Sequence, residues 1–348
     1  MTLFRSFILA IGLFVAMPGF SQDRFFTQFY ATPLEVNPAL TGAIDGTYRV
    51  SLAYHDQWRG ILDNPYQTYG VFGDFRFSLG DRSKDYAGAG IAFVADRNGI
   101  FNYNTNQITV SGAFHKNLNG RSTQYLSGGF YLGILQRSVN YENLTFEDQF
   151  NGLDGYTPGT REDLPENNIA TGDIGIGLNY AMEASNNFQL SGGLALAHLA
   201  SPSISFFRKT DGFEDSEDAT LKTRITGYAN FNIGLNESLQ LLPRLAVFSQ
   251  GEALMAQGGA NLRFSINKYN NNALHIGAGM RFAKDIQALK PSSVMALTGI
   301  ELGSFMMGLS YEYSLDDLSN DLLGQGILEF TATFIGEYEN ANSFCPKF

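Results

Sequence analysis

Apolar residues recur at every second position in segments of about ten residues, and this alternation restricts the fold more than any other feature of the sequence. In the first clear segment, Tyr48, Val50, Leu52 and Tyr54 share one face, and small or polar residues share the other. A period of two is that of a β-strand with one face in an apolar environment. The alternation predicts about fourteen strands, over residues 48–58, 67–79, 87–96, 104–117, 125–139, 169–182, 187–198, 222–235, 239–249, 253–266, 273–282, 293–302, 305–314 and 326–338.

The connections between these strands alternate in length. One set is short and rich in Gly, Asn, Asp, Ser or Lys, and it comprises residues 80–86, 118–124, 183–186, 236–238, 267–272 and 303–304. The other set includes the two longest connections, 140–168 and 199–221, although Gln250 to Glu252 is short where a longer loop is expected. Short periplasmic turns and longer extracellular loops are typical of outer-membrane barrels. We therefore predict an all-β fold, a transmembrane antiparallel β-barrel over residues 48–338, with a periplasmic tail at 339–348.

The first 21 residues are typical of a secretory signal peptide. Arg5 precedes an apolar run from Phe7 to Met17, and Gly19 and Ser21 are the small residues before Gln22. A membrane-spanning helix is the alternative, but it needs about 20 apolar residues and this run is shorter. We expect cleavage near Ser21, export, and integral residence in the outer membrane.

In the second predicted strand, Phe72 departs from the alternation of apolar and polar residues.

Residues 22–47 do not alternate in this way, because Pro33 and Pro38 interrupt them. This segment could lie in the lumen as a plug or precede the barrel as a periplasmic lead-in, and proline spacing does not distinguish the two. The residues that would form the plug are Gln28, Phe29, Tyr30, Asn37 and Pro38. Charges of both signs on the opposite strand face, including Asp74, Arg76 and Asp173, favour a packed or plugged interior over an ion-selective pore.

Composition and motifs argue against several classes of function. The net charge of −11, without a cluster of Lys and Arg, argues against nucleic-acid binding. His55, His115, His198 and His275 stand on four separate predicted strands, and Cys345 has no second cysteine. These positions provide no spacing typical of a metal site, a cofactor site or a catalytic dyad. Ser111 and His115 are too far apart along one strand to hydrogen-bond. We expect no enzyme activity, no cofactor and no metal.

Several short motifs carry a resemblance to a known family. They are FTQFYATPL at 26–34, NPALTG at 37–42, YHDQW at 54–58, DRNG at 96–99, NQI at 106–108, QRS at 136–138, LTFEDQF at 144–150, YEYSL at 311–315, GILEF at 326–330 and CPKF at 345–348. Together they resemble the PorP/SprF family over almost the whole mature chain. The resemblance implies an outer-membrane protein of the type IX secretion system of Bacteroidetes, in the branch linked to surface adhesins and gliding motility. This sequence differs from the family pattern at Tyr311-Glu312-Tyr313-Ser314, where members of the family commonly have Tyr-Asp-Ile-Asn.

The resemblance and the loop lengths together suggest a function for the extracellular loops. We expect the long loops to capture a cognate secreted adhesin through its type IX C-terminal domain, with the translocon and outer-membrane lipid as further partners. A passive channel or small-solute transporter is the alternative, because a barrel of this size can enclose a lumen. Aromatic residues among acidic ones suit an anchoring contact, and the candidates are Phe146, Phe150, Tyr156, Phe206, Phe207 and Phe213.

Overall fold

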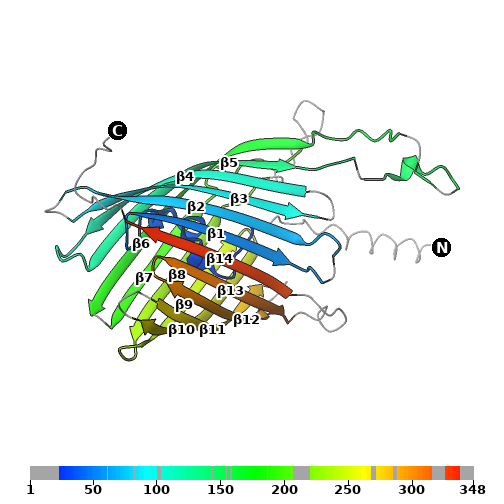
Figure 1. Cartoon of the computed structure of the whole chain (residues 1–348). Helices are drawn as coiled ribbons and strands as arrows, with labels where there is room; N and C mark the ends of the chain where they lie inside the picture. Colours follow the sequence, from blue (N-terminus) through cyan, green and yellow to red (C-terminus); the bar gives the residue numbers. More distant parts are fainter. Residues whose placement is uncertain are drawn as a thin grey trace, which may run out of the picture.

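Fourteen antiparallel strands form a closed barrel in the computed structural model of this chain (Figure 1). Each strand pairs with the next along the sequence, and β14 pairs with β1 from Gly336 opposite Tyr48 to Ile327 opposite Gln57. The predicted fold class is therefore confirmed. The structure describes residues 23–60, 62–80, 84–99, 103–142, 144–153, 155–156, 159–185, 187–206, 220–267, 272–284, 288–315 and 326–337. The predicted signal peptide at 1–21 and tail at 339–348 lie outside these residues.

The strands lie close to the predicted ranges. Their bounds are β1 Tyr48–Gln57, β2 Tyr66–Ser78, β3 Tyr86–Asn98, β4 Tyr103–Asn117, β5 Gln124–Ser138, β6 Asn168–Ser185, β7 Phe188–Ala197, β8 Arg224–Gly234, β9 Leu239–Gln250, β10 Ala253–Asn267, β11 Asn272–Lys284, β12 Leu289–Leu302, β13 Phe305–Ser314 and β14 Gly326–Gly336. The prediction missed the start of β12, which includes Pro291. Proline has no N–H to donate, and the pairing of β11 with β12 shifts register beside it, between Arg281 and Phe282. His198 follows β7 instead of lying within it.

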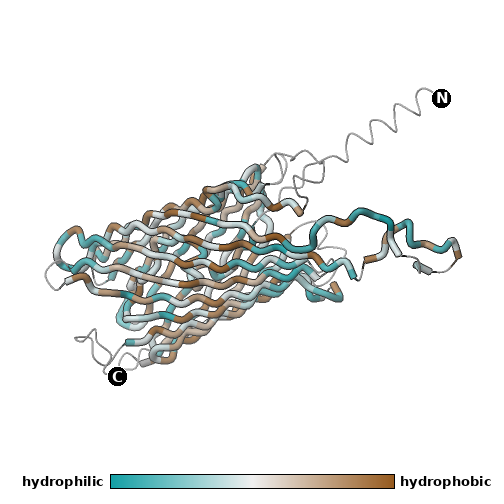
Figure 2. The backbone as a smooth tube through the Cα atoms, turned by 90° about the horizontal axis from the view of Figure 1, so that it is seen from above, coloured by the Kyte–Doolittle hydropathy of each residue, from teal (hydrophilic) through white to brown (hydrophobic). Residues whose placement is uncertain are grey.

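The two faces of the sheet differ as the alternation predicts. Val50, Leu52 and Val71 are exposed on the outside of the barrel, and Figure 2 shows apolar positions recurring along the strands. Phe72 does not break the alternation, because it lies on the inner face with Asp74 and is only 2% exposed. It is an apolar residue in the lumen, where it packs in a buried cluster with Phe26. No helix among the described residues is long and apolar enough to span a membrane.

Short turns gather at one end of the barrel, which we call the turn end. They connect β2 to β3, β4 to β5, β6 to β7, β8 to β9, β10 to β11 and β12 to β13. The opposite end, the loop end, carries the connections at 139–167 and 198–223, and the first of these projects beyond the rim of the barrel (Figure 1). In outer-membrane barrels the short turns face the periplasm. The loop end therefore faces outward from the cell.

Residues 23–46, the N-terminal segment, lie inside the barrel. The segment contains three short helices, η1 Phe29–Ala31, α2 Pro33–Val36 and η2 Pro38–Leu40, and Figure 1 shows it in dark blue within the ring of strands. Helix η2 contacts β4, β5 and β6, while η1 contacts β14 on another part of the wall. A second buried cluster joins Phe29 and Val36 to Tyr228, Ala246 and Phe248. The segment therefore packs against much of the inner wall.

Candidate functional site

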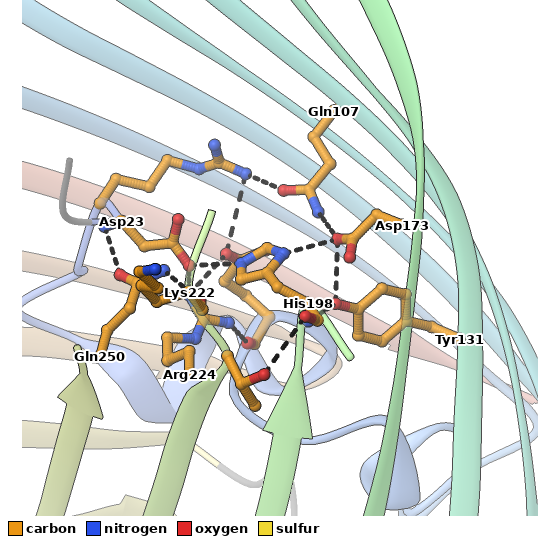
Figure 3. A network of polar contacts seen from close by, with 11 residues as sticks. Asp23, Gln107, Tyr131, Asp173, His198, Lys222, Arg224 and Gln250 are labelled. Carbon is orange, nitrogen blue, oxygen red and sulfur yellow. Dashed lines mark hydrogen bonds and ion pairs between the residues drawn. The ribbon is translucent and has the colours of Figure 1, made fainter. Parts of the chain in front are cut away.

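The N-terminal segment begins at the loop end, in a network of charged and polar side chains (Figure 3). The Asp23 carboxylate lies 2.6 Å from Nε2 of His198 and 2.9 Å from Nη1 of Arg224. The backbone N–H of Asp23 donates to the side chain of Gln250 at 2.9 Å. His198, Arg224 and Gln250 all lie where their strands meet the loop end. These contacts tie the start of the segment to three neighbouring strands.

His198 links this end of the segment to a carboxylate on β6. Its Nδ1 atom lies 2.9 Å from Asp173, which also accepts hydrogen bonds from Tyr131 and Gln107, both at 3.0 Å. Burial works to lower the pKa of His198, but its contacts with Asp173 and Asp23 outweigh burial and raise that pKa to about 9. The imidazolium therefore stays charged at neutral pH and bridges two carboxylates.

A second set of contacts fixes the segment to β14. The Glu329 carboxylate is completely buried and accepts hydrogen bonds from the backbone N–H groups of Thr27 at 2.8 Å and Gln28 at 2.6 Å. It also lies 3.1 Å from Nδ1 of His55. On β13, Glu312 accepts a hydrogen bond from the Thr27 hydroxyl at 2.9 Å. Charge-assisted hydrogen bonds of this kind are about twice as strong as neutral ones.

The segment ends near the turn end, where its backbone approaches the wall closely. The Gly42 N–H donates to Asp74 at 2.7 Å, and Asp74 is also paired with Arg49 at 2.7 Å. A Cβ atom added to Gly129 would lie 2.5 Å from the carbonyl oxygen of Pro38. Only glycine leaves room for this approach. The segment therefore runs through the lumen from the loop end to the turn end.

The residues that the sequence proposes for a plug lie among these contacts. Gln28, Phe29, Asn37 and Pro38 are buried, and Tyr30 is half-buried. The Asn37 side chain donates to the backbone carbonyl of Leu178 on β6 at 2.9 Å. The sequence did not identify the wall residues that hold the segment, such as Glu329 and His198. The alternation places Glu329 on the inner face, but it gives no pairing across so many residues.

A buried serine–histidine pair is present, but its surroundings do not suit catalysis. His115 Nδ1 lies 2.7 Å from the Ser127 hydroxyl, and its Nε2 lies 2.8 Å from the backbone carbonyl of Thr41. A hydrolytic triad needs an acid or amide behind the histidine and a nucleophile that substrate can reach. Both side chains are buried, with exposures of 0% and 1%. The pair instead connects β4 and β5 to the N-terminal segment. Over the described ranges, no three acidic, histidine or cysteine residues form a group suited to a metal ion.

The proposed loop residues separate into two groups. Phe150 and Tyr156 form an isolated bridge in the β5–β6 loop, their rings lie 5.4 Å apart, and both are exposed. Phe146, in the same loop, is half-buried. Phe206, in the β7–β8 loop, lies 6.2 Å from the ring of Tyr103. Phe207 and Phe213 lie outside the described residues. The structure thus brings Phe150 and Tyr156 together and places Phe206 beside Tyr103.

Solved structures that resemble this chain are outer-membrane barrels of low sequence identity. A TodX deltaS2S3 mutant monoaromatic hydrocarbon channel has a TM-score of 0.49 and 11% identity, covering 88% of this chain and 94% of that one. A Pseudomonas aeruginosa FadL homologue has a TM-score of 0.45 and 11% identity, with coverage of 86% and 92%. The Pseudomonas putida toluene transporter TodX has a TM-score of 0.43 and 14% identity, with coverage of 91% and 95%.

Sequence comparison identifies the family. None of the curated proteins searched matches the chain. Residues 19–334 match the family described as type IX secretion system membrane protein PorP/SprF. The match extends from before the N-terminal segment into β14, so it includes both the barrel and the segment inside it. The strand pairing establishes the closed β-barrel independently of any relative, and the chain belongs to the PorP/SprF family of type IX secretion system membrane proteins.

Proposed function

We propose that this secretion-associated barrel retains a secreted adhesin at the cell surface by binding its type IX C-terminal domain at the loop end. The observation that carries the proposal is the tip of the β5–β6 loop. Leu153 is 87% exposed there, between Phe150 and Tyr156, which are 47% and 53% exposed. Apolar groups exposed together beyond the rim are typical of a protein-binding surface.

Local hydrogen bonds hold this tip in a defined shape. The side chain of Asn151 accepts from the N–H groups of Leu153 at 3.0 Å and Gly155 at 3.2 Å. Below the tip, Asp148 accepts from the hydroxyl of Thr160 at 3.0 Å and joins the two arms of the loop. A surface that is already ordered loses less conformational entropy on binding. Such order supports a recognition role for the tip.

The charges around the tip suggest the chemistry of the partner. Glu142, Glu147, Asp148, Glu162 and Asp163 are all exposed in the same loop. We infer that the adhesin domain presents an apolar patch with basic residues around it, because interfaces pair a desolvated centre with a complementary polar rim. The contacts of the N-terminal segment with the wall support a barrel that anchors its partner at the outer face instead of conducting it.

Replacing the two aromatic residues tests the proposal. The variant Phe150→Ala with Tyr156→Ala removes two central anchors, and truncating such anchors costs about 2 kcal/mol or more each. We expect most of the adhesin to move from the cell surface to the culture medium. Phe305→Ala with Phe334→Ala is the matched control, because that pair of rings, 4.6 Å apart, lies at the turn end. Full retention by the loop variant, with normal amounts of barrel, would contradict the proposal.

Recordings in planar bilayers separate this proposal from the alternative of a passive channel. A lumen closed by the N-terminal segment should conduct no steady current. Stable conductance of the wild-type protein, with the same unit size in every insertion, would support the channel instead. Retention of the adhesin and conductance are independent measurements, so each of the two proposed functions can be rejected separately.

A further inference from the structure

The turn end of the lumen holds a cavity of about 620 Å³. Thr123, Gln240 and Met306, each next to a short turn, contribute to its lining. The cavity therefore opens toward the periplasm, on the opposite side of the barrel from the loops discussed above. Its volume lies in the range of about 300–1,000 Å³ that is typical of ligand pockets.

Arg244 lines this cavity and lacks the partner that such a group needs. Its Nη1 atom is buried and has no hydrogen-bond partner among the described residues. Three other lumen arginines are paired with carboxylates: Arg49 with Asp74 at 2.7 Å, Arg224 with Asp23 at 2.9 Å and Arg281 with Glu312 at 3.0 Å. Burying a guanidinium away from water without an anionic partner costs several kcal/mol. The environment of Arg244 therefore favours an incoming anion.

The groups around Arg244 are already engaged. Tyr30 of the N-terminal segment covers one side of the guanidinium, whose central carbon lies 3.7 Å from the ring centroid. The carboxylate of Glu301, which also lines the cavity, is bound to Arg263 at 2.9 Å and His275 at 2.7 Å. Tyr30 carries no carboxylate, and Glu301 attracts Arg244 electrostatically while both of its oxygen atoms are bound to Arg263 and His275. The free Nη1 atom belongs to a side chain whose position is fixed by stacking on Tyr30.

A second buried atom without a partner lies on the neighbouring strand. Asn230 pairs with Arg244 across β8 and β9, and its Oδ1 atom has no hydrogen-bond partner in the described chain. A buried acceptor of this kind needs an N–H or O–H donor. A ligand that satisfies both atoms must combine an anionic acceptor with a nearby donor. A peptide that carries a carboxylate has both, because its main chain provides N–H groups.

We propose that this cavity binds a peptide segment from the periplasm by pairing its carboxylate with Arg244. The planar guanidinium can hold a carboxylate through two parallel hydrogen bonds. Asn230 accepts a hydrogen bond from the peptide main chain, and Gln189, Ser191 and Asn232 provide further polar contacts in the lining. The site lies at the turn end, so it is independent of the adhesin-binding loops.

Binding of model peptides to the purified full-length protein tests this site. The probes are N-acetyl-trialanine with a free C-terminal carboxylate, the same peptide with a C-terminal amide, and N-acetyl-Ala-Glu-Ala amide. We expect the free acid to bind, measured by titration calorimetry in detergent, and the trialanine amide to bind at least about 10-fold more weakly. The third peptide distinguishes the source of the carboxylate, because its binding would show that an acidic side chain serves as well as a chain end.

Substitutions then connect the binding to Arg244. Arg244→Gln should weaken the binding of the free-acid peptide at least about 10-fold, since it removes the positive charge and one of the two parallel hydrogen bonds to the carboxylate. Arg76→Gln is the control, because Arg76 stacks on Tyr86 and does not line the cavity. Equal binding of acid and amide, unchanged affinity of a folded Arg244→Gln protein, or no binding of the acid at about 10 mM would overturn the proposal.

Discussion

Replacing Glu329 by alanine should release the N-terminal segment from β14 without opening the barrel. The change leaves the N–H groups of Thr27 and Gln28 without the carboxylate that accepts them at 2.8 and 2.6 Å. A buried N–H group without an acceptor costs about 1–3 kcal/mol, so the two together cost about 2–6 kcal/mol. A loss of about 3 kcal/mol raises the population of the detached segment about 100-fold.

Hydrogen exchange followed by mass spectrometry measures this change directly. Peptides that contain Thr27 and Gln28 should exchange about 100-fold faster in Glu329→Ala than in the wild type, while peptides from β4 and β5 keep their protection. The exchange rate in Glu329→Gln should lie between the rates in the wild type and in Glu329→Ala, because the single amide oxygen can accept a good hydrogen bond from only one of these N–H groups. Glu337→Ala is the control, since Glu337 is exposed. Unchanged protection of Thr27 and Gln28 in a folded Glu329→Ala barrel would refute the reasoning.

Further substitutions and changes of pH test other contacts of the segment. Gly129→Ala should speed proteolysis of the segment, because the new Cβ would lie 2.5 Å from the Pro38 oxygen, whereas Gly172→Ala meets nothing within 4 Å and should have no effect. Phe72→Ala should lower the free energy of unfolding in urea by about 3–5 kcal/mol through the cavity it leaves. Phe75→Ala, on the outer face, should lower it less. The pKa of His198 is raised to about 9, above its ordinary value of 6.5. The contribution of His198 to stability is therefore complete below about pH 6.5 and lost as the pH rises through about 9. Exchange at Asp23, corrected for its intrinsic pH dependence, should rise over that window in the wild type and stay flat in His198→Gln.

The strands could be predicted from the sequence because the surroundings of each strand determine the pattern of its own residues. Lipid on one face and packed lumen on the other impose a period of two, which survives in segments such as Tyr48 to Tyr54. Errors arose where a local rule competes with pairing, as at Pro291, where β12 begins earlier than the alternation indicates. Phe72 looked irregular only because its apolar partner, Phe26, belongs to a distant segment.

The contacts of the N-terminal segment could not be predicted from the sequence in the same way. The structure has three short helices between Phe29 and Leu40 and its first strand at Tyr48. Proline spacing left the lumen and the periplasm equally open as places for this segment. The pairing of Asp23 with Arg224, and of Thr27 with Glu329, depends on how the closed barrel brings distant residues together. Those partners carry no sequence signal beyond their place on the inner face. Arg244 was on that face too, but its missing partner is visible only in three dimensions.

The path of the N-terminal segment also restricts how the barrel can assemble. Asp23 lies at the loop end, whereas Tyr48 starts β1 at the turn end and pairs with Gly336 at the far end of the chain. A finished barrel would have to admit this segment lengthwise past side chains that already fill the lumen. Closing the contact between β1 and β14 around a segment already in place avoids that obstacle. Because this contact joins the most distant strands, it also has the largest loop-closure entropy to overcome. The seam between β1 and β14 is therefore expected to form last during insertion.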